Sequence, residues 1–174
     1  MQYFHSYESP LGKMLLLANQ GALTGLYFDA QRYYPQWDTA WIPGPTHRVI
    51  AQTCGELDEY FSGRRTAFDV PLEFHGTEFQ IRVWNAINDV KLGETITYSE
   101  LARRCGHPGS VRAVGAATGR NRISVIVPCH RIVGSSGKLT GYAGGLVKKQ
   151  DLLAGEKRTP LPRFAARSPG MAAG

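Results

Sequence analysis

Apolar runs and turn residues alternate over the first 29 residues, a pattern typical of a small β-meander. Three strand-like runs (3–7, 13–19 and 22–29) are separated by SPLG and NQG, which are turn sequences. Residues 30–45 are rich in aromatic residues and proline and have no clear period, so we expect a loop there. The chain is therefore predicted to begin with a short antiparallel sheet and a long connection.

Helical periodicity follows this loop. Apolar side chains form one stripe from Thr46 to Phe61, and Gly63 is suited to end that helix. Segment 66–74 is apolar enough for a strand, but Pro71 restricts it to the edge of a sheet because proline has no N–H to donate. Residues 1–75 are thus predicted to form a small α/β domain, an antiparallel sheet with one helix.

Two capping boxes open the helices of the second half. Thr77 with Gln80 and Thr97 with Glu100 each place a hydroxyl three residues before a long polar side chain. Such pairs satisfy the free N–H groups at a helix start. The first helix is amphipathic and is expected to continue until Gly93.

The second capping box begins a helix that is followed by GHPG and then by another helix, from Ser110 to Thr118. Two helices joined by a short turn with glycine have the order of a helix-turn-helix, although many such pairs do not bind nucleic acid. The second helix of this pair consists mostly of small residues, and Arg112 is its one long side chain before Arg120. Glycine inside a helix costs about 1 kcal/mol relative to alanine. Tight core packing or entry into a nucleic-acid groove would each offset that cost.

The remaining chain ends in a cysteine-containing motif, a loop and a helix. The run 123–127 is apolar and β-branched, and we expect it to be a strand that leads into Pro128-Cys129-His130. A Gly/Ser-rich loop and a helix that includes Leu146 and Leu153 come next. We divide the chain into an N-terminal domain (1–75), a C-terminal domain (76–156) and a flexible basic tail (157–174).

Charge is distributed unevenly along the chain. The net charge is −3 over residues 1–75, +5 over 76–156 and +4 over 157–174, giving +6 overall. A basic second half favours a polyanionic partner, although an ordinary basic surface would give the same pattern. No apolar run is long enough for a membrane span, and the N-terminus lacks the order of a signal peptide.

Cysteine usage indicates an intracellular protein. Three widely spaced cysteines make a poor disulfide framework and suit a reducing compartment, so we expect a cytoplasmic protein, associated with the nucleoid, or a nuclear one in a eukaryote. His5, His47, Cys54 and His75 lack the spacing of a metal site, and we predict no metal and no cofactor.

Cys129 is the strongest candidate for chemistry. A thiol reacts as thiolate, and a neighbouring imidazole or cation lowers its pKa. His130 is adjacent, but neighbours on a regular strand point to opposite faces. The chain must therefore turn at Pro128 or Cys129, or His130 must act through a water molecule. A buried structural cysteine remains the alternative.

The chain from Phe79 to Glu156 resembles the C-terminal domain of the O6-alkylguanine-DNA alkyltransferases. The matching segments are TYSELA, VRAVGAATGRN, VPCHR, SGKLTGYAGGL and KKQDLLAGE. Residues 1–75 are similar to the family's N-terminal domain more loosely, through SPLG and FDVPLEFHGTEFQ. The resemblance implies an α/β protein whose N-terminal domain is ribonuclease H-like. Its C-terminal domain would be mostly helical, with a helix-turn-helix and the PCHR active-site segment.

The resemblance also implies roles for individual residues. Cys129 would accept the alkyl group, and His130 would act through a water with Glu156 as the orienting carboxylate. Tyr98 would help to protonate the departing guanine, and Asn121 would join the recognition helix to the active-site segment. Further implied residues are Arg112 as the finger that replaces the flipped nucleotide; Ser110, Ala113, Ala116, Ala117 and Gly119 at the DNA; and Ile132, Tyr142, Ala143 and Gly144 with Tyr98 in the guanine pocket. The chain departs from the family pattern at Arg122, where proline is common, and at Ala143, where some members have serine.

The function implied is direct-reversal DNA repair. An alkyl group on O6-alkylguanine, and on O4-alkylthymine, in duplex DNA would pass once and irreversibly to Cys129 after nucleotide flipping. The expected enzyme is a single-turnover methylated-DNA–protein-cysteine methyltransferase that binds the minor groove. It is expected to be a monomer in solution, with cooperative assembly on DNA left open. Alternatives are a non-catalytic lesion-binding protein of the same fold, a Cys–His hydrolase and a helix-turn-helix regulator.

Overall fold

The computed structural model describes residues 1–157, and the basic tail predicted for 157–174 lies outside this range from residue 158 on. The N-terminal domain contains a four-stranded sheet in the order β3-β2-β1-β4. β1 pairs antiparallel with β2, β2 with β3, and β4 runs parallel to β1. The bounds are Tyr3–Ser9 for β1, Gly12–Ala18 for β2, Leu23–Phe28 for β3 and Ile42–Pro43 for β4.

Both faces of β2 are buried, because its side chains alternate between two apolar clusters. Met14 and Leu16 belong to the main core, with the apolar stripe of α1 (Arg48–Phe61). Leu15 and Leu17 face the other way and are covered by aromatic residues, among them Trp41. The aromatic connection after β3 therefore covers the second face of the sheet.

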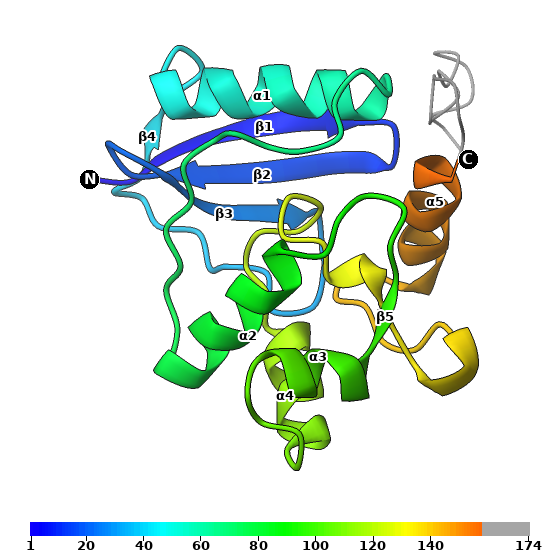
Figure 1. Ribbon diagram of the computed structural model, residues 1–174. Coiled ribbons are helices and arrows are strands. Elements are labelled where there is room, and N and C mark those ends of the chain that lie inside the picture. Colours follow the sequence, from blue (N-terminus) through cyan, green and yellow to red (C-terminus); the bar gives the residue numbers. More distant parts are fainter. Residues whose placement is uncertain (158–174) are drawn as a thin grey trace.

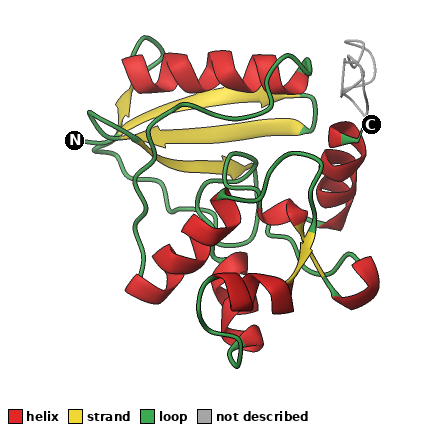
Figure 2. Cartoon of the chain, in the orientation of Figure 1, coloured by secondary structure: helices red, strands yellow, loops and turns green. Residues whose placement is uncertain are grey.

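Helices dominate the C-terminal domain. Figure 1 shows α2, α3 and α4 grouped on the β3 side of the sheet, away from α1, and Figure 2 shows how little strand this half contains. Its helices are α2 (Glu78–Asn88), α3 (Tyr98–Arg104), α4 (Val111–Gly119) and α5 (Leu146–Glu156), with a short parallel pair, β5 (Ile96–Thr97) and β6 (Ile132–Val133).

The two predicted capping boxes differ in the structure. At Thr77 both halves form, because its hydroxyl accepts from Gln80 N and the Gln80 side chain accepts from Thr77 N. At Thr97 only the hydroxyl contact forms. The carboxylate of Glu100 instead accepts hydrogen bonds from Arg103 and Arg104, and these hold the pKa of Glu100 at about 2.

Three element predictions need correction. Residues 42–43 of the expected loop form β4, which lies beside β1. Segment 66–74 is no edge strand, since a single bridge between Leu72 and Leu23 is its contact with the sheet. α2 ends at Asn88, before Gly93, with Asp89 as its cap. Within residues 1–157, no helix has the length and apolar character of a membrane span.

Candidate active site

Residues 123–131 form a series of tight turns where a strand was predicted. Val125 has φ 71°, in the left-handed region, which breaks the extended conformation. Cys129–Arg131 is one turn of 3₁₀ helix, so the chain does turn immediately after Pro128. The run 123–127 is apolar because it is buried: Ser124 N donates to Leu26 O of β3, which fixes the turns against the sheet domain.

The side chain of Asn121 supplies the hydrogen bonds that a strand partner would have supplied. Its Oδ1 accepts from Ile123 N at 3.0 Å. Its Nδ2 lies 2.9 Å from Val127 O and 3.2 Å from the Sγ of Cys129. Because Asn121 follows α4, one buried amide connects that helix to the thiol.

Cys129 lies at the bottom of a cavity and is 8% exposed. Burial raises the pKa of its thiol, and the hydrogen bond from Asn121 and the charge of Lys149 oppose only part of that rise. The resting group is therefore a protonated thiol, and its reaction requires a base.

His130 has a buried acidic partner. Its Nε2 lies 2.6 Å from Oε1 of Glu156, and its Nδ1 has no hydrogen-bond partner in the described chain. Burial lowers the pKa of His130 and outweighs the attraction of Glu156, so the imidazole is neutral at pH 7. A neutral ring that donates a hydrogen bond from its Nε2–H to a carboxylate has an unprotonated Nδ1, which can accept a proton.

Glu156 is held ionised by its neighbours. Arg131 donates to both of its oxygens, at 2.9 and 3.0 Å, and the hydroxyl of Tyr60 donates to Oε1 at 2.7 Å. Burial alone would raise the pKa of Glu156, but His130 and Arg131 outweigh it and hold that pKa well below the ordinary range. Arg131 is therefore a buried partner of this carboxylate.

The cavity above Cys129 has a volume of about 490 Å³, which lies within the usual range for small-molecule sites, roughly 300–1,000 Å³. Tyr98, Tyr142 and Ala143 line it as predicted. Ile132 and Gly144, which were also expected in the pocket, are not among the residues that line it. A side chain at Gly144 would meet Phe28 at 2.9 Å, so only glycine allows this close approach. The other lining residues are Arg32, Tyr33, Gly115, Ala116, Thr118, Gly119, Arg120 and Gly141.

Lys149 is a site residue that we did not predict. Its side chain is fully buried, and Nζ donates to the carbonyl oxygens of Ile132 (2.6 Å), Thr140 (2.9 Å) and Gly141 (3.1 Å). Burial lowers the pKa of Lys149 to about 8. Through these hydrogen bonds, Lys149 connects the segment that contains Tyr142 to the segment that follows Cys129. The signal in the sequence was a lysine on the apolar side of the last helix, three residues before Leu152.

The residues expected at the DNA lie mostly on one surface. Arg112, Ala113 and Ala116 of α4 are exposed, while Ser110 and Gly119 at its two ends are half-buried. The expected position of Ala117 at the DNA needs correction. Ala117 is 3% exposed, and its carbonyl accepts a hydrogen bond from Trp84 of α2. The small residues of α4 thus allow it to pack closely on α2 and leave its outer face uncovered.

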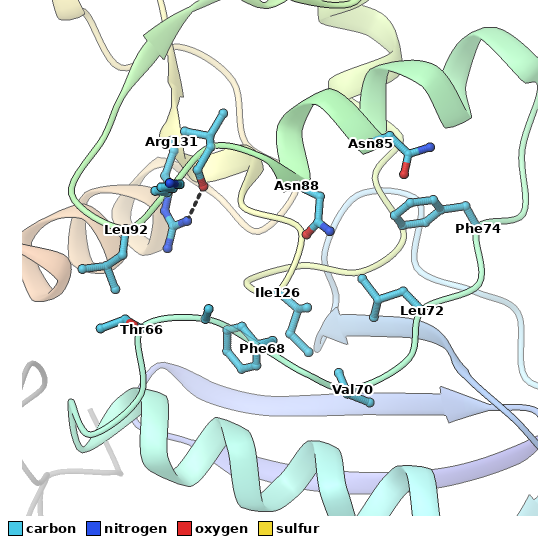
Figure 3. A pocket seen from close by; sticks show the side chains of 13 residues that line it. Thr66, Phe68, Val70, Leu72, Phe74, Asn85, Asn88, Leu92, Ile126 and Arg131 are labelled. Carbon is cyan, nitrogen blue, oxygen red and sulfur yellow. Dashed lines mark hydrogen bonds between the residues drawn. The ribbon is translucent and has the colours of Figure 1, made fainter.

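A larger cavity, of about 740 Å³, lies between segment 66–74 and α2 (Figure 3). Phe68, Leu72 and Ile126 point into it, and Arg131 reaches one end, where it donates to Val90 O at 2.7 Å. Among the described residues that line this cavity there is no cysteine, histidine or carboxylate. Within residues 1–157, no three His, Cys, Asp or Glu side chains are grouped to hold a metal ion.

Comparison with known families decides the identity of this arrangement. Residues 78–158 match the DNA binding domain of 6-O-methylguanine DNA methyltransferase, and residues 2–74 match the ribonuclease-like domain of the same protein. The chain belongs to the 6-O-methylguanine DNA methyltransferase family. It is accordingly an α/β enzyme of DNA repair, a protein-cysteine methyltransferase.

Relatives of this methyltransferase family are similar along most of the chain. The methylated-DNA–protein-cysteine methyltransferase of Mycolicibacterium paratuberculosis is 46% identical over 155 residues, which cover 89% of this chain and 92% of the relative. That of Methanosarcina acetivorans is 42% identical, with 87% and 96% covered. The crystal structure of Mycobacterium tuberculosis OGT in complex with DNA is similar with a TM-score of 0.82 and 43% identity, over 89% of this chain and 92% of that one.

Proposed function

We propose that this protein removes alkyl groups from O6-alkylguanine in duplex DNA, and from O4-alkylthymine, by transferring them once to Cys129. The single observation that supports this most is the position of Cys129. It lies at the bottom of a cavity, with Asn121 on its sulfur and the His130–Glu156 pair beside it. The damaged nucleotide flips out of the duplex to enter that cavity.

In the proposed reaction, His130 acts as the base. Nδ1 takes the proton of the Cys129 thiol through a water molecule, and Glu156 stabilises the imidazolium that forms. The sulfur attacks the alkyl carbon, a C–S bond forms as the C–O bond breaks, and the electron pair leaves with guanine. Tyr98 gives the departing base a proton. Burial raises the pKa of Tyr98, so this phenol is protonated at neutral pH.

The outer face of α4 is the proposed DNA contact. Arg112 is exposed near the start of α4, and the small alanine and glycine residues around it allow this helix to approach a minor groove closely. The inserted Arg112 fills the space left by the flipped nucleotide. Contacts of this kind go mainly to the sugar-phosphate backbone, so we expect little sequence preference.

The thioether formed on Cys129 has no route back to the thiol, so each molecule reacts once. We further propose that the protein is a monomer in solution and acts in the cytoplasm, at the nucleoid, or in the nucleus of a eukaryote. We also propose a domain boundary near residue 75, supported by the capping box that starts α2 at Thr77.

Intact-protein mass spectrometry tests the proposal. After incubation with a duplex oligonucleotide that contains O6-methylguanine, we expect the protein to gain one methyl group, which peptide mapping assigns to Cys129. If the protein binds the lesion and gains no mass, it is a non-catalytic lesion-binding protein. If the oligonucleotide loses its methyl group and the protein stays unmodified, it is a hydrolase.

A further inference from the structure

The N-terminal domain builds part of the rim of the Cys129 cavity. Arg32 and Tyr33, from the connection after β3, line this cavity together with Arg120, which follows α4. The backbone N–H of Arg32 donates to the carbonyl of Ala143 at 2.9 Å, so the connection is attached to the cavity wall. The reaction and the DNA contact proposed above do not use these three side chains.

Two guanidinium groups meet at the Tyr33 ring. The Cζ of Arg120 lies 3.9 Å from the ring centroid, and that of Arg32 lies 4.9 Å from it. The face of an aromatic ring attracts cations without neutralising their charge. Neither arginine forms an ion pair with any residue in the range 1–157. Two positive charges therefore lie against one ring that lines both cavities, and within residues 1–157 no ion pair neutralises either of them.

The backbone holds the ring in place through an unfavourable conformation. Ala30 (φ 58°) and Tyr33 (φ 61°) both adopt left-handed conformations, which residues other than glycine rarely adopt. Gln31 fixes the turn from inside, because its Oε1 accepts hydrogen bonds from Phe28 N (2.8 Å) and from Ser124 (3.2 Å). Backbone strain of this kind collects at ligand-binding positions.

Tyr33 and Arg120 also line a second, smaller cavity of about 330 Å³, which contains Gln80 and Arg122. The pair thus forms the wall between that cavity and the Cys129 cavity. A DNA strand whose nucleotide occupies the Cys129 cavity would bring its backbone close to the residues at the mouth of that cavity.

We infer that Arg32 and Arg120 form a binding site for a DNA backbone phosphate beside the flipped nucleotide, with the Tyr33 ring holding both cations in position. Guanidinium groups match phosphate oxygens through paired hydrogen bonds. A purely packing role would not require two cations, which repel each other unless an anion lies between them. Because it requires a nucleotide in the Cys129 cavity, the site depends on the function proposed above.

The test compares Arg32→Ala and Arg120→Ala with Arg48→Ala, a matched loss of an exposed charge at the start of α1. Affinity for duplex DNA that contains O6-methylguanine is measured against salt concentration in a Cys129→Ser background, so that no transfer interferes. Each rim variant should bind severalfold more weakly, and its log–log salt slope should be shallower by about 1, as expected for one lost phosphate contact. Arg48→Ala should change neither quantity.

A second measurement distinguishes the loss of a phosphate contact from a change in the shape of the Cys129 cavity. With Cys129 intact, the two rim variants should lose more rate on methylated duplex than on free O6-benzylguanine, which has no phosphate. Equal losses on both substrates, or salt slopes like that of Arg48→Ala, would overturn the phosphate site. If the otherwise unaltered protein gains no alkyl group on Cys129, the proposed function itself fails, which is a different outcome.

Discussion

The Nε2 atom of His130 lies 2.6 Å from Oε1 of Glu156, inside a buried group that also contains Arg131 and Tyr60. The carboxylate is the one negative charge among these four side chains. Its removal would leave Arg131 as a buried cation without a counterion, which is far more costly than the loss of an exposed ion pair. The carboxylate on which the stability of this group depends is therefore also the one to which we assign a role in the proposed reaction.

Glu156→Gln should lower stability in a pH-dependent way. A carboxylate whose pKa is depressed in the folded state stabilises the fold above its unfolded pKa of about 4.3, and loses that effect as the pH falls through the folded value. At pH 7 we expect a loss of about 3 kcal/mol, measured by urea unfolding. Below about pH 4 the difference from the unsubstituted protein should shrink. Glu78→Gln, at an exposed position, is the control. A constant difference from pH 7 to pH 3 would contradict the assignment.

Cys129→Ser should abolish alkyl transfer and leave DNA affinity largely intact. Serine keeps the shape of the side chain, but its hydroxyl does not ionise at neutral pH. Transfer is measured by mass spectrometry and affinity by fluorescence anisotropy with labelled duplex. Cys54→Ser is the matched control, since burial and Asp58 raise the pKa of Cys54 to about 11. Transfer by the Cys129 variant at an unreduced rate would end the proposal.

Arg112→Ala should impair repair of duplex DNA more than reaction with free O6-benzylguanine. Only the duplex requires a side chain to occupy the place of the flipped nucleotide, which costs a few kcal/mol to unstack. The measurement is the pair of single-turnover rate constants for the two substrates. Arg82→Ala on α2, also exposed, serves as the control for loss of charge. An equal fall in the rate constants for both substrates would contradict the proposal that Arg112 takes the place of the flipped nucleotide.

Lys149→Met should shift the pH dependence of the reaction. The charge of Lys149 favours the Cys129 thiolate, so its removal raises the thiol pKa, and less thiolate is present at a given pH. The rate on O6-benzylguanine should fall at pH 7, and the midpoint of its rise with pH should move upward. Lys148→Met, whose Nζ lies 5.5 Å from the Phe28 ring centroid, is the neighbouring control. A uniform fall at every pH would mean that Lys149 only fastens the cavity wall.

Local signals in the sequence predicted the elements well where neighbours in the chain decide the conformation. The three strands of the meander and the start of α2 at Thr77 depend on turn residues and a capping box, and the structure has them there. The strand expected over 123–127 failed because an apolar run without period fits a buried turn equally well. There the side chain of Asn121, rather than a neighbouring strand, satisfies the backbone.

The site was only partly accessible from the sequence. Adjacent Cys129 and His130 indicated chemistry, but the partnership with Glu156 came from family resemblance, because tertiary folding brings the end of α5 to His130. Lys149 occupies an ordinary position of the last helix, and nothing in the neighbouring sequence shows that it donates hydrogen bonds to three carbonyl groups. Arg32 and Tyr33 belong to the other domain, so no motif around Cys129 includes them.

Aspartate could not take the place of Asn121, because the amide group acts as a hydrogen-bond donor in this structure. Spontaneous deamidation would turn this side chain into aspartate, which has the same shape but two oxygens and no hydrogen to donate. One of those oxygens would then face Val127 O and the sulfur of Cys129, where Nδ2 now lies. A new negative charge at that point would repel the thiolate, so this one change of side chain would stop the reaction proposed for Cys129.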